Sequence, residues 1–227
     1  YKEGAINIIT LILFIAFALL VVVGVIFIQQ GTRRIPVQYA KRVVGRKMYG
    51  GQSTHIPLKV NQAGVIPVIF AVSLLQFPLT ITYFLKSNSG FTAFVTKWLS
   101  PSGNPGVWVY AIFNIILIIA FNYFYTTISF NPIEVAQNMK SNGGFIPGIR
   151  PGKATIEYLA KVMGRISIVG ALFLAVIATL PTLISQYTGL NIRFGGTSLL
   201  IVVGVAIDVM RQLENQMVMR NYKGFLK

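Results

Sequence analysis

The chain contains no cysteine, and this absence removes several kinds of chemistry at once. It excludes disulfides, thiolate metal sites and cysteine nucleophiles. Histidine is nearly absent as well, because His55 is the only one, which leaves little room for a metal centre or imidazole catalysis. No paired carboxylates stand inside an apolar run, and no Gly-x-Ser-x-Gly motif is present. The sequence therefore argues against an enzyme and predicts neither a metal nor a cofactor.

Charge is scarce, and it is almost all of one sign. Charged residues make up 11% of the chain, against roughly 25% in ordinary soluble domains. Hydrophobic residues make up 54%, and the mean hydropathy is +0.67. The net charge is +15, since 20 basic residues face only five acidic ones. A basic total need not indicate nucleic acid when the charge lies outside membrane spans.

What the sequence does have is long apolar runs. A membrane-spanning helix needs about 20 mostly apolar residues. The third run ends before Asn131-Pro132, because a residue that precedes proline avoids the helical region. The fifth becomes amphipathic through Asp208, Arg211 and Glu214, and Arg211 is placed to partner Asp208. The chain is therefore expected to be an all-α polytopic membrane protein with five transmembrane helices, at about residues 6–28, 65–85, 108–130, 166–184 and 197–215.

The connections between these runs predict an orientation. The stretch Gly31–Lys59 holds seven basic residues and no acidic one. Loops rich in Lys and Arg stay on the cytoplasmic side of a bilayer. If loops 31–63 and 131–165 and the tail after Ile207 are cytoplasmic, 16 of the 20 basic residues lie on that side. The C-terminus is then cytoplasmic and the first residue lies outside, which predicts that the chain is the C-terminal part of a longer protein.

Both cytoplasmic loops are longer than the usual link between helices. The first contains two β-prone runs around a basic bend, which predicts a projecting hairpin. The second places Arg150 between Gly148 and Gly152 in an exposed turn, followed by a short amphipathic helix around 156–163. Two interpretations stay open: the cations orient the chain and touch anionic lipid headgroups, or the loops form a docking platform for a large cytosolic partner. On the outer side, residues 87–106 predict a short interfacial helix.

One face of the second apolar run is mildly polar. Ile69, Ser73, Gln76 and Thr80 follow the spacing i, i+4, i+7, i+11. Unpaired polar groups are costly in hydrocarbon, so this face is not expected to meet lipid alone. It either packs against another helix or lines an aqueous path, with Ile69 as an apolar constriction. In the third run, Asn114 and Asn122 are expected to form interhelical hydrogen bonds.

Four segments carry a family resemblance: Arg33–Arg42, Gln52–Asn61, Gly148–Gly152 and Gly195–Ile201. In these segments the chain resembles the SecY family, the channel subunits of the bacterial Sec translocon. The resemblance covers essentially the whole chain. It implies that the chain is half of a SecY-type channel, whose five spans match the sixth to tenth transmembrane helices of the family.

The resemblance also implies roles for particular residues. Ile69 and Ile201 match two members of the apolar ring that narrows the pore. The run 65–85 would form one side of the lateral gate, with Ser73, Gln76, Phe77 and Thr80 on or near the gate face. The positions that would meet a motor or the ribosome are Arg33, Arg34, Lys41, Arg42, Arg46, Lys47, Arg150 and Lys153.

The implied function is a channel that moves unfolded preproteins across the bacterial plasma membrane and releases transmembrane segments into it. Implied partners are the N-terminal half of the channel subunit, SecE, SecG, the SecA ATPase, the ribosome, signal sequences, preproteins and anionic lipids. Two other classes remain open. Half of a secondary transporter would show broken helices and a midplane substrate site, and an assembly scaffold would conduct nothing.

Overall fold

The computed structural model describes residues 8–39, 42–44, 47–49, 53–85, 90–100, 105–188 and 196–223. Its long helices are α1 (Ile8–Gln30), α2 (Ile66–Phe84), α4 (Gly106–Ser129), α6 (Lys153–Thr188) and α7 (Gly196–Lys223). The shorter helices are α3 (Gly90–Trp98) and α5 (Pro132–Ser141). The strands are β1 (Thr32–Tyr39), β2 (Arg42–Val44), β3 (Lys47–Tyr49), β4 (Ser53–Lys59) and β5 (Gly144–Phe145).

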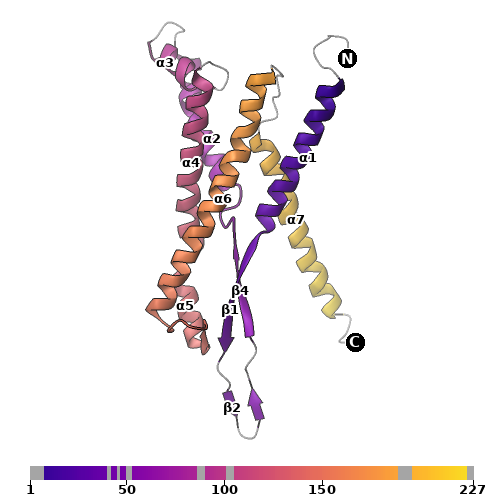
Figure 1. Ribbon diagram of the computed structural model, residues 1–227, viewed down its shortest axis with the longest axis vertical. Coiled ribbons are helices and arrows are strands. Elements are labelled where there is room, and N and C mark those ends of the chain that lie inside the picture. Colours follow the sequence, from indigo (N-terminus) through magenta and orange to yellow (C-terminus); the bar gives the residue numbers. More distant parts are fainter. Residues whose placement is uncertain are drawn as a thin grey trace.

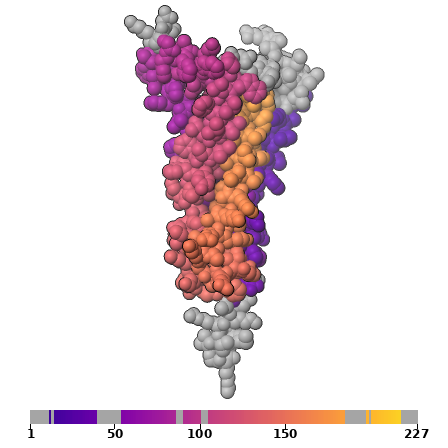
Figure 2. Space-filling view, turned by 60° about the vertical axis from the view of Figure 1, so that its left-hand side comes forward, coloured from indigo at the N-terminus to yellow at the C-terminus, as the bar shows by residue number. Residues whose placement is uncertain are grey.

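The long helices run side by side, and a β-hairpin projects from one end of them (Figure 1). We call this the hairpin end; the opposite end carries α3. Side chains of α1, α2, α4, α6 and α7 share a buried cluster that includes Val25, Val68, Ile118, Leu174 and Leu200. In the space-filling view α4 and α6 lie against each other over most of their length (Figure 2).

Three segments of the described chain are long and apolar enough to cross a membrane: 66–84, 106–141 and 153–184. A shorter apolar helix covers Ile15–Gln30. The expected first and fifth spans are therefore helical, as α1 and α7, but fall outside these three segments. The expected count of five spans stays a prediction.

The first loop forms the expected hairpin. Strands β1 and β4 pair antiparallel from Thr32↔Lys59 to Gln38↔Ser53, and β2 pairs with β3 beyond them. The chain therefore contains β-strands between its long helices and is not strictly all-α. Ile35, Val37 and Leu58 bury one face of the ladder against α5 and the first half of α6, in a second cluster that contains Leu159. This packing fixes the hairpin to the helices.

The second loop is more helical than expected. Residues Pro132–Ser141, within the expected loop 131–165, form the helix α5. The Asn131 side chain accepts hydrogen bonds from the backbone N–H groups of Ile133 and Glu134, and proline occupies the first turn. An N-cap asparagine, a proline and an early acid are start signals that could have predicted this helix.

The amphipathic helix expected around 156–163 is not separate from the fourth span. Both belong to α6, a single helix of 36 residues. Its first half has the apolar stripe that packs on the hairpin, and the stretch from Ile166 to Val176 is apolar apart from Ser167. The junction Met163-Gly164-Arg165 holds a single glycine, which a helix tolerates, and no proline, so the helix continues.

Candidate functional site

The candidate site lies where α2 and α7 meet near the hairpin end. A methyl group added at Gly204 would lie 3.0 Å from Cγ1 of Val65, so the residue that caps the start of α2 contacts α7 there. Beyond this contact, Val68 and Leu200 are buried together in the helical cluster. Helix α2 leads away from the hairpin and α7 returns towards it.

Ile69 and Ile201 lie at a similar depth beyond that contact. Helices rise 1.5 Å per residue, so Ile69 is about 6 Å past Val65 and Ile201 about 4.5 Å before Gly204. Their neighbours Val68 and Leu200 point into the core, with 1% and 0% of their surface exposed. Ile69 itself is 40% exposed, and Ile201 is half-buried. This chain therefore leaves each of the two isoleucines partly uncovered.

A cavity of about 270 Å³ opens on the hairpin side of the Val65–Gly204 contact. It is lined by the end of α1, the β4–α2 connection and α7. Its charged lining residues are Lys59, Asp208 and Arg211. Asn61 is 5% exposed and donates to the Gly64 carbonyl at 2.9 Å, while its Oδ1 atom has no partner among the described residues. A polar vestibule thus precedes the apolar level of Ile69 and Ile201.

Arg211 does not pair with Asp208 as the sequence suggested. Its Nη2 atom donates to the Gln29 carbonyl at 3.4 Å. That carbonyl belongs to the last turn of α1, where carbonyls lack intrahelical donors and cations are favourable. Arg211 therefore links α7 to the end of α1. The Asp208 carboxylate is exposed and faces the vestibule.

The polar face of α2 is uncovered within the described chain. Ser73, Gln76, Phe77 and Thr80 are all exposed, and Phe77 is 67% exposed. The Ser73 hydroxyl donates to the Ile69 carbonyl at 2.7 Å, and the Thr80 hydroxyl donates to the Gln76 carbonyl at 3.0 Å. Because the carbonyls of α2 itself accept from these two hydroxyls, neither hydroxyl needs a hydrogen-bond partner on another helix. The opposite face, with Ala71 and Leu75, is buried.

Of the expected interhelical asparagines, one is confirmed. The Asn122 amide donates to the Ser167 carbonyl of α6 at 3.1 Å. Asn114 is also buried, but its Oδ1 atom has no partner among the described residues. Asn122 therefore joins α4 to α6, and neither asparagine lines the vestibule.

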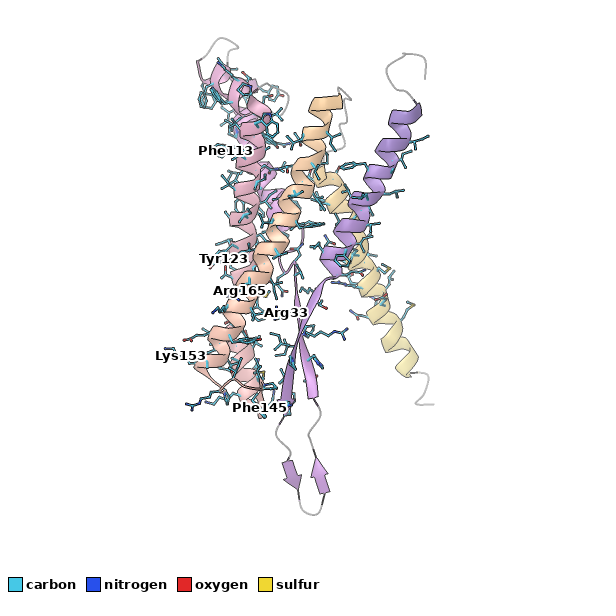
Figure 3. The ribbon with its side chains drawn as sticks, viewed as in Figure 1. Arg33, Phe113, Tyr123, Phe145, Lys153 and Arg165 are labelled. Atoms are coloured by element: carbon cyan, nitrogen blue, oxygen red, sulfur yellow. The ribbon has the colours of Figure 1, made fainter. Side chains whose placement is uncertain are left out.

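The turn that carries Arg150 is tightly built. Gly148 and Gly152 have φ angles of +81° and +111°, which L side chains rarely adopt. The hydroxyl of the fully buried Thr155 donates to the Arg150 carbonyl at 3.0 Å. The Arg150 side chain is exposed, and three residues further on the exposed Lys153 begins α6 (Figure 3 labels Lys153). The turn therefore presents two cations from a fixed backbone.

The other expected docking cations follow the hairpin. Arg33 and Arg34 are exposed on β1. Arg42 pairs with Tyr49 and Lys47 with Val44 across β2 and β3, but only the backbone of these residues is described. Lys41 and Arg46 lie outside the described residues. Among the described residues, no group of three His, Cys, Asp or Glu side chains could hold a metal ion.

Comparisons with known proteins fit this geometry. The family model SecY matches residues 1–210. A protein translocase subunit SecY of Mycobacterium bovis is 54% identical over 222 residues, covering 93% of this chain and 50% of the relative. The SecY subunit of Halalkalibacterium halodurans is 52% identical over 223 residues, covering 97% and 51% respectively. The chain therefore spans about half the length of these curated relatives.

Solved structures show the same fold. A structure described as a protein conducting channel superposes with a TM-score of 0.63 at 22% identity, covering 95% of this chain and 51% of that one. A second, on a SecY protein whose plug domain stabilises the closed state of the translocation channel, gives 0.61 at 23% identity, covering 90% and 49%.

Proposed function

The chain belongs to the SecY family, and we propose that it forms the C-terminal half of a protein-conducting channel. In this proposal unfolded preproteins cross the bacterial plasma membrane through the channel, and transmembrane segments leave it sideways into lipid. The N-terminal half of the channel subunit completes the pore, and SecE and SecG accompany it. SecA or the ribosome supplies the driving force, and this chain hydrolyses nothing.

The proposal rests mainly on the sequence of polar and apolar surfaces met along α2 and α7 from the hairpin end. A polar vestibule opens at the hairpin end, and the two partly uncovered isoleucines follow about one helical turn further. Apolar side chains around a narrow pore resist ion leak because water leaves such a constriction. Aliphatic side chains at this level also part readily around a moving chain, since they hold no fixed hydrogen bonds.

The exposed face of α2 supports a lateral gate. Ser73, Gln76 and Phe77 combine weakly polar and apolar groups, and the hydroxyls of this face are satisfied within the helix. Such a face tolerates water, a passing polypeptide or lipid without leaving many unpaired groups. Pro78 lies within α2, and proline allows a helix to bend.

The basic hairpin end supports docking of a cytosolic partner. Arg150 and Lys153 stand on a fixed turn, and the hairpin is held against α5 and α6. In this proposal the hairpin end and the C-terminus are cytoplasmic, and the first residue lies outside. Partner binding shifts the gate only to the extent that the partner prefers its open state.

Proteoliposomes that contain the complete channel complex test the proposal. ATP-dependent uptake of an unfolded preprotein, with SecA added, is the expected result. Uptake of small solutes without a motor would favour half of a secondary transporter instead. No conductance even with the gate forced open would favour an assembly scaffold. Either of these two results contradicts the proposed channel.

A further inference from the structure

A second opening lies where α1 passes into β1, beside the middle of α6. It is an open groove of about 450 Å³, lined by Gly31, Thr32, Arg33, Val60, Arg165, Ile166 and Val169. The lining holds two arginines and no acidic residue. Figure 3 shows Arg33 and Arg165 at a similar height, between the long helices and the hairpin. The groove is separate from the vestibule, with which it shares no lining residue.

The strand geometry distinguishes Arg33 from its neighbour Arg34. Successive side chains of a strand point to opposite faces. Arg33 shares its face with Ile35 and Val37, which are buried in the cluster against α6. Arg33 therefore faces α6 and lines the groove, whereas Arg34 is on the other face and does not.

The sequence of α6 places the groove at the edge of the bilayer-length helices. Arg165 is the last charged residue before the apolar half of α6. Val169, Leu172 and Val176 follow at i+4, i+7 and i+11, on the same side of the helix. Their exposed fractions are 59%, 49% and 50%. The cationic Arg165 is thus followed along α6 by an exposed row of apolar side chains, which we call the apolar track and which leads into the membrane-spanning part.

We propose that this groove binds an anionic phospholipid, with its phosphate between Arg33 and Arg165 and an acyl chain along α6. Guanidinium groups hold phosphate oxygens bidentately, and the exposed Thr32 side chain offers a further hydroxyl donor. A lipid whose net charge is negative is favoured over a zwitterionic one, because the groove has no acidic group to meet a choline. The family resemblance implies anionic lipids as partners in general terms, and the groove assigns one of them a defined place, whether or not the chain conducts protein.

The rival occupant is an acidic segment of a partner protein. Arginines alone would accept either ligand. The apolar track favours the lipid, since it continues directly from Arg165 over three exposed side chains of a helix that is long enough to span the bilayer. An acyl chain fills such a track without leaving backbone groups unpaired.

Native mass spectrometry of the complete complex, released from nanodiscs of phosphatidylglycerol and phosphatidylcholine, tests the proposal. The native complex should retain a phosphatidylglycerol molecule. The double variant Arg33→Gln, Arg165→Gln should lose it, because its affinity for the lipid falls roughly tenfold or more. The matched control is Arg34→Gln, Lys161→Gln, which removes the same charge from exposed positions that do not line the groove. The control should retain the lipid as the native complex does.

Three results would overturn the assignment. Equal loss from both double variants would show a diffuse charge effect rather than a site. Undiminished retention in the Arg33→Gln, Arg165→Gln variant would show that the lipid binds elsewhere. Release of an acidic subunit from that variant, with its lipid unchanged, would show that the groove is a protein contact. Arg165→Lys, which keeps charge but loses the guanidinium fork, should bind more weakly than native; native affinity there would contradict bidentate binding.

Discussion

At the scale of single residues, Ile69 and Ile201 differ from most exposed apolar side chains of this chain by their neighbours. Each follows a residue that is buried in the shared helical cluster, and each lies just beyond the polar vestibule. An isoleucine that faces only lipid has no such polar approach. Composition alone does not distinguish these two from the exposed isoleucines of α4.

Asparagine at either position should therefore open the seal. In the complete channel, Ile69→Asn and Ile201→Asn should admit water, raise ion leak in planar bilayers and relax the demand for a strong signal sequence. The matched control is Ile112→Asn on α4, where the native isoleucine is 55% exposed and distant in sequence from both α2 and α7.

If the two isoleucines were core residues instead, asparagine would act on stability. An unpaired buried amide costs about 1–3 kcal/mol, so yield and thermal stability would fall. Well-folded variants with native conductance and native signal-sequence discrimination would refute the pore assignment.

Arg150 is the docking residue with the best-defined backbone. Arg150→Glu should reduce motor-dependent translocation roughly tenfold or more, because reversing a charge at a specific contact leaves its partner group opposed. Expression and membrane insertion should be unchanged, since the side chain is exposed. Translocation by proteoliposomes measures the effect, with Lys140→Glu on α5 as the control of equal charge change. Equal losses in the two variants would show that Arg150 contributes only to the overall positive charge and is not a specific docking residue.

At the scale of elements, the sequence predicted those features that rest on strong local signals. The hairpin follows from two β-prone runs, and the end of α4 follows from Asn131-Pro132; both are found. The helix α5 was not predicted because an Asn-Pro pair such as Asn131-Pro132 is also typical of a turn. The continuity of α6 was missed because its period changes from one apolar stripe to apolar all round, which resembles two separate helices.

Glycines in α6 give an element-scale prediction about how α6 meets the base of the hairpin. A methyl group at Gly170 would lie 2.7 Å from the Val60 carbonyl oxygen, so Gly170→Ala should lower stability by about 1–3 kcal/mol. Gly164 has no neighbour within 4 Å of that position, so Gly164→Ala should be neutral or stabilising by up to about 1 kcal/mol. Thermal unfolding in detergent compares them. Equal midpoints for the two variants would contradict the close approach.

The hairpin tip supplies a second prediction at this scale. If Arg46 and Lys47 contact ribosomal RNA, the double variant Arg46→Glu, Lys47→Glu should weaken ribosome binding and flatten its dependence on salt, because fewer counterions are released. The control Lys140→Glu, Lys161→Glu changes the same charge away from the hairpin. If the hairpin variant keeps the native dependence of ribosome affinity on salt, these cations only orient the chain in the membrane.

At the scale of the whole molecule, the described helices leave surfaces uncovered that we propose to line a pore. Its buried cluster holds the five long helices together, yet the polar face of α2 and the two isoleucines are left open. The sequence could predict which faces are polar, apolar or basic, since these follow from spacing. It could not predict the vestibule, because Asn61, Asp208 and Arg211 come together only through the contact of α2 with α7.

Site-specific photo-crosslinking to a stalled preprotein tests the central claim most directly. A photoreactive phenylalanine analogue is placed at Ile69, at Ile201 or at Phe113, which lies on α4 and is 52% exposed (Figure 3). With a preprotein arrested in transit through the complete channel, we expect adducts from positions 69 and 201 and none from 113. Adducts from position 113 alone, or from none of the three positions while translocation is under way, would contradict a path between α2 and α7.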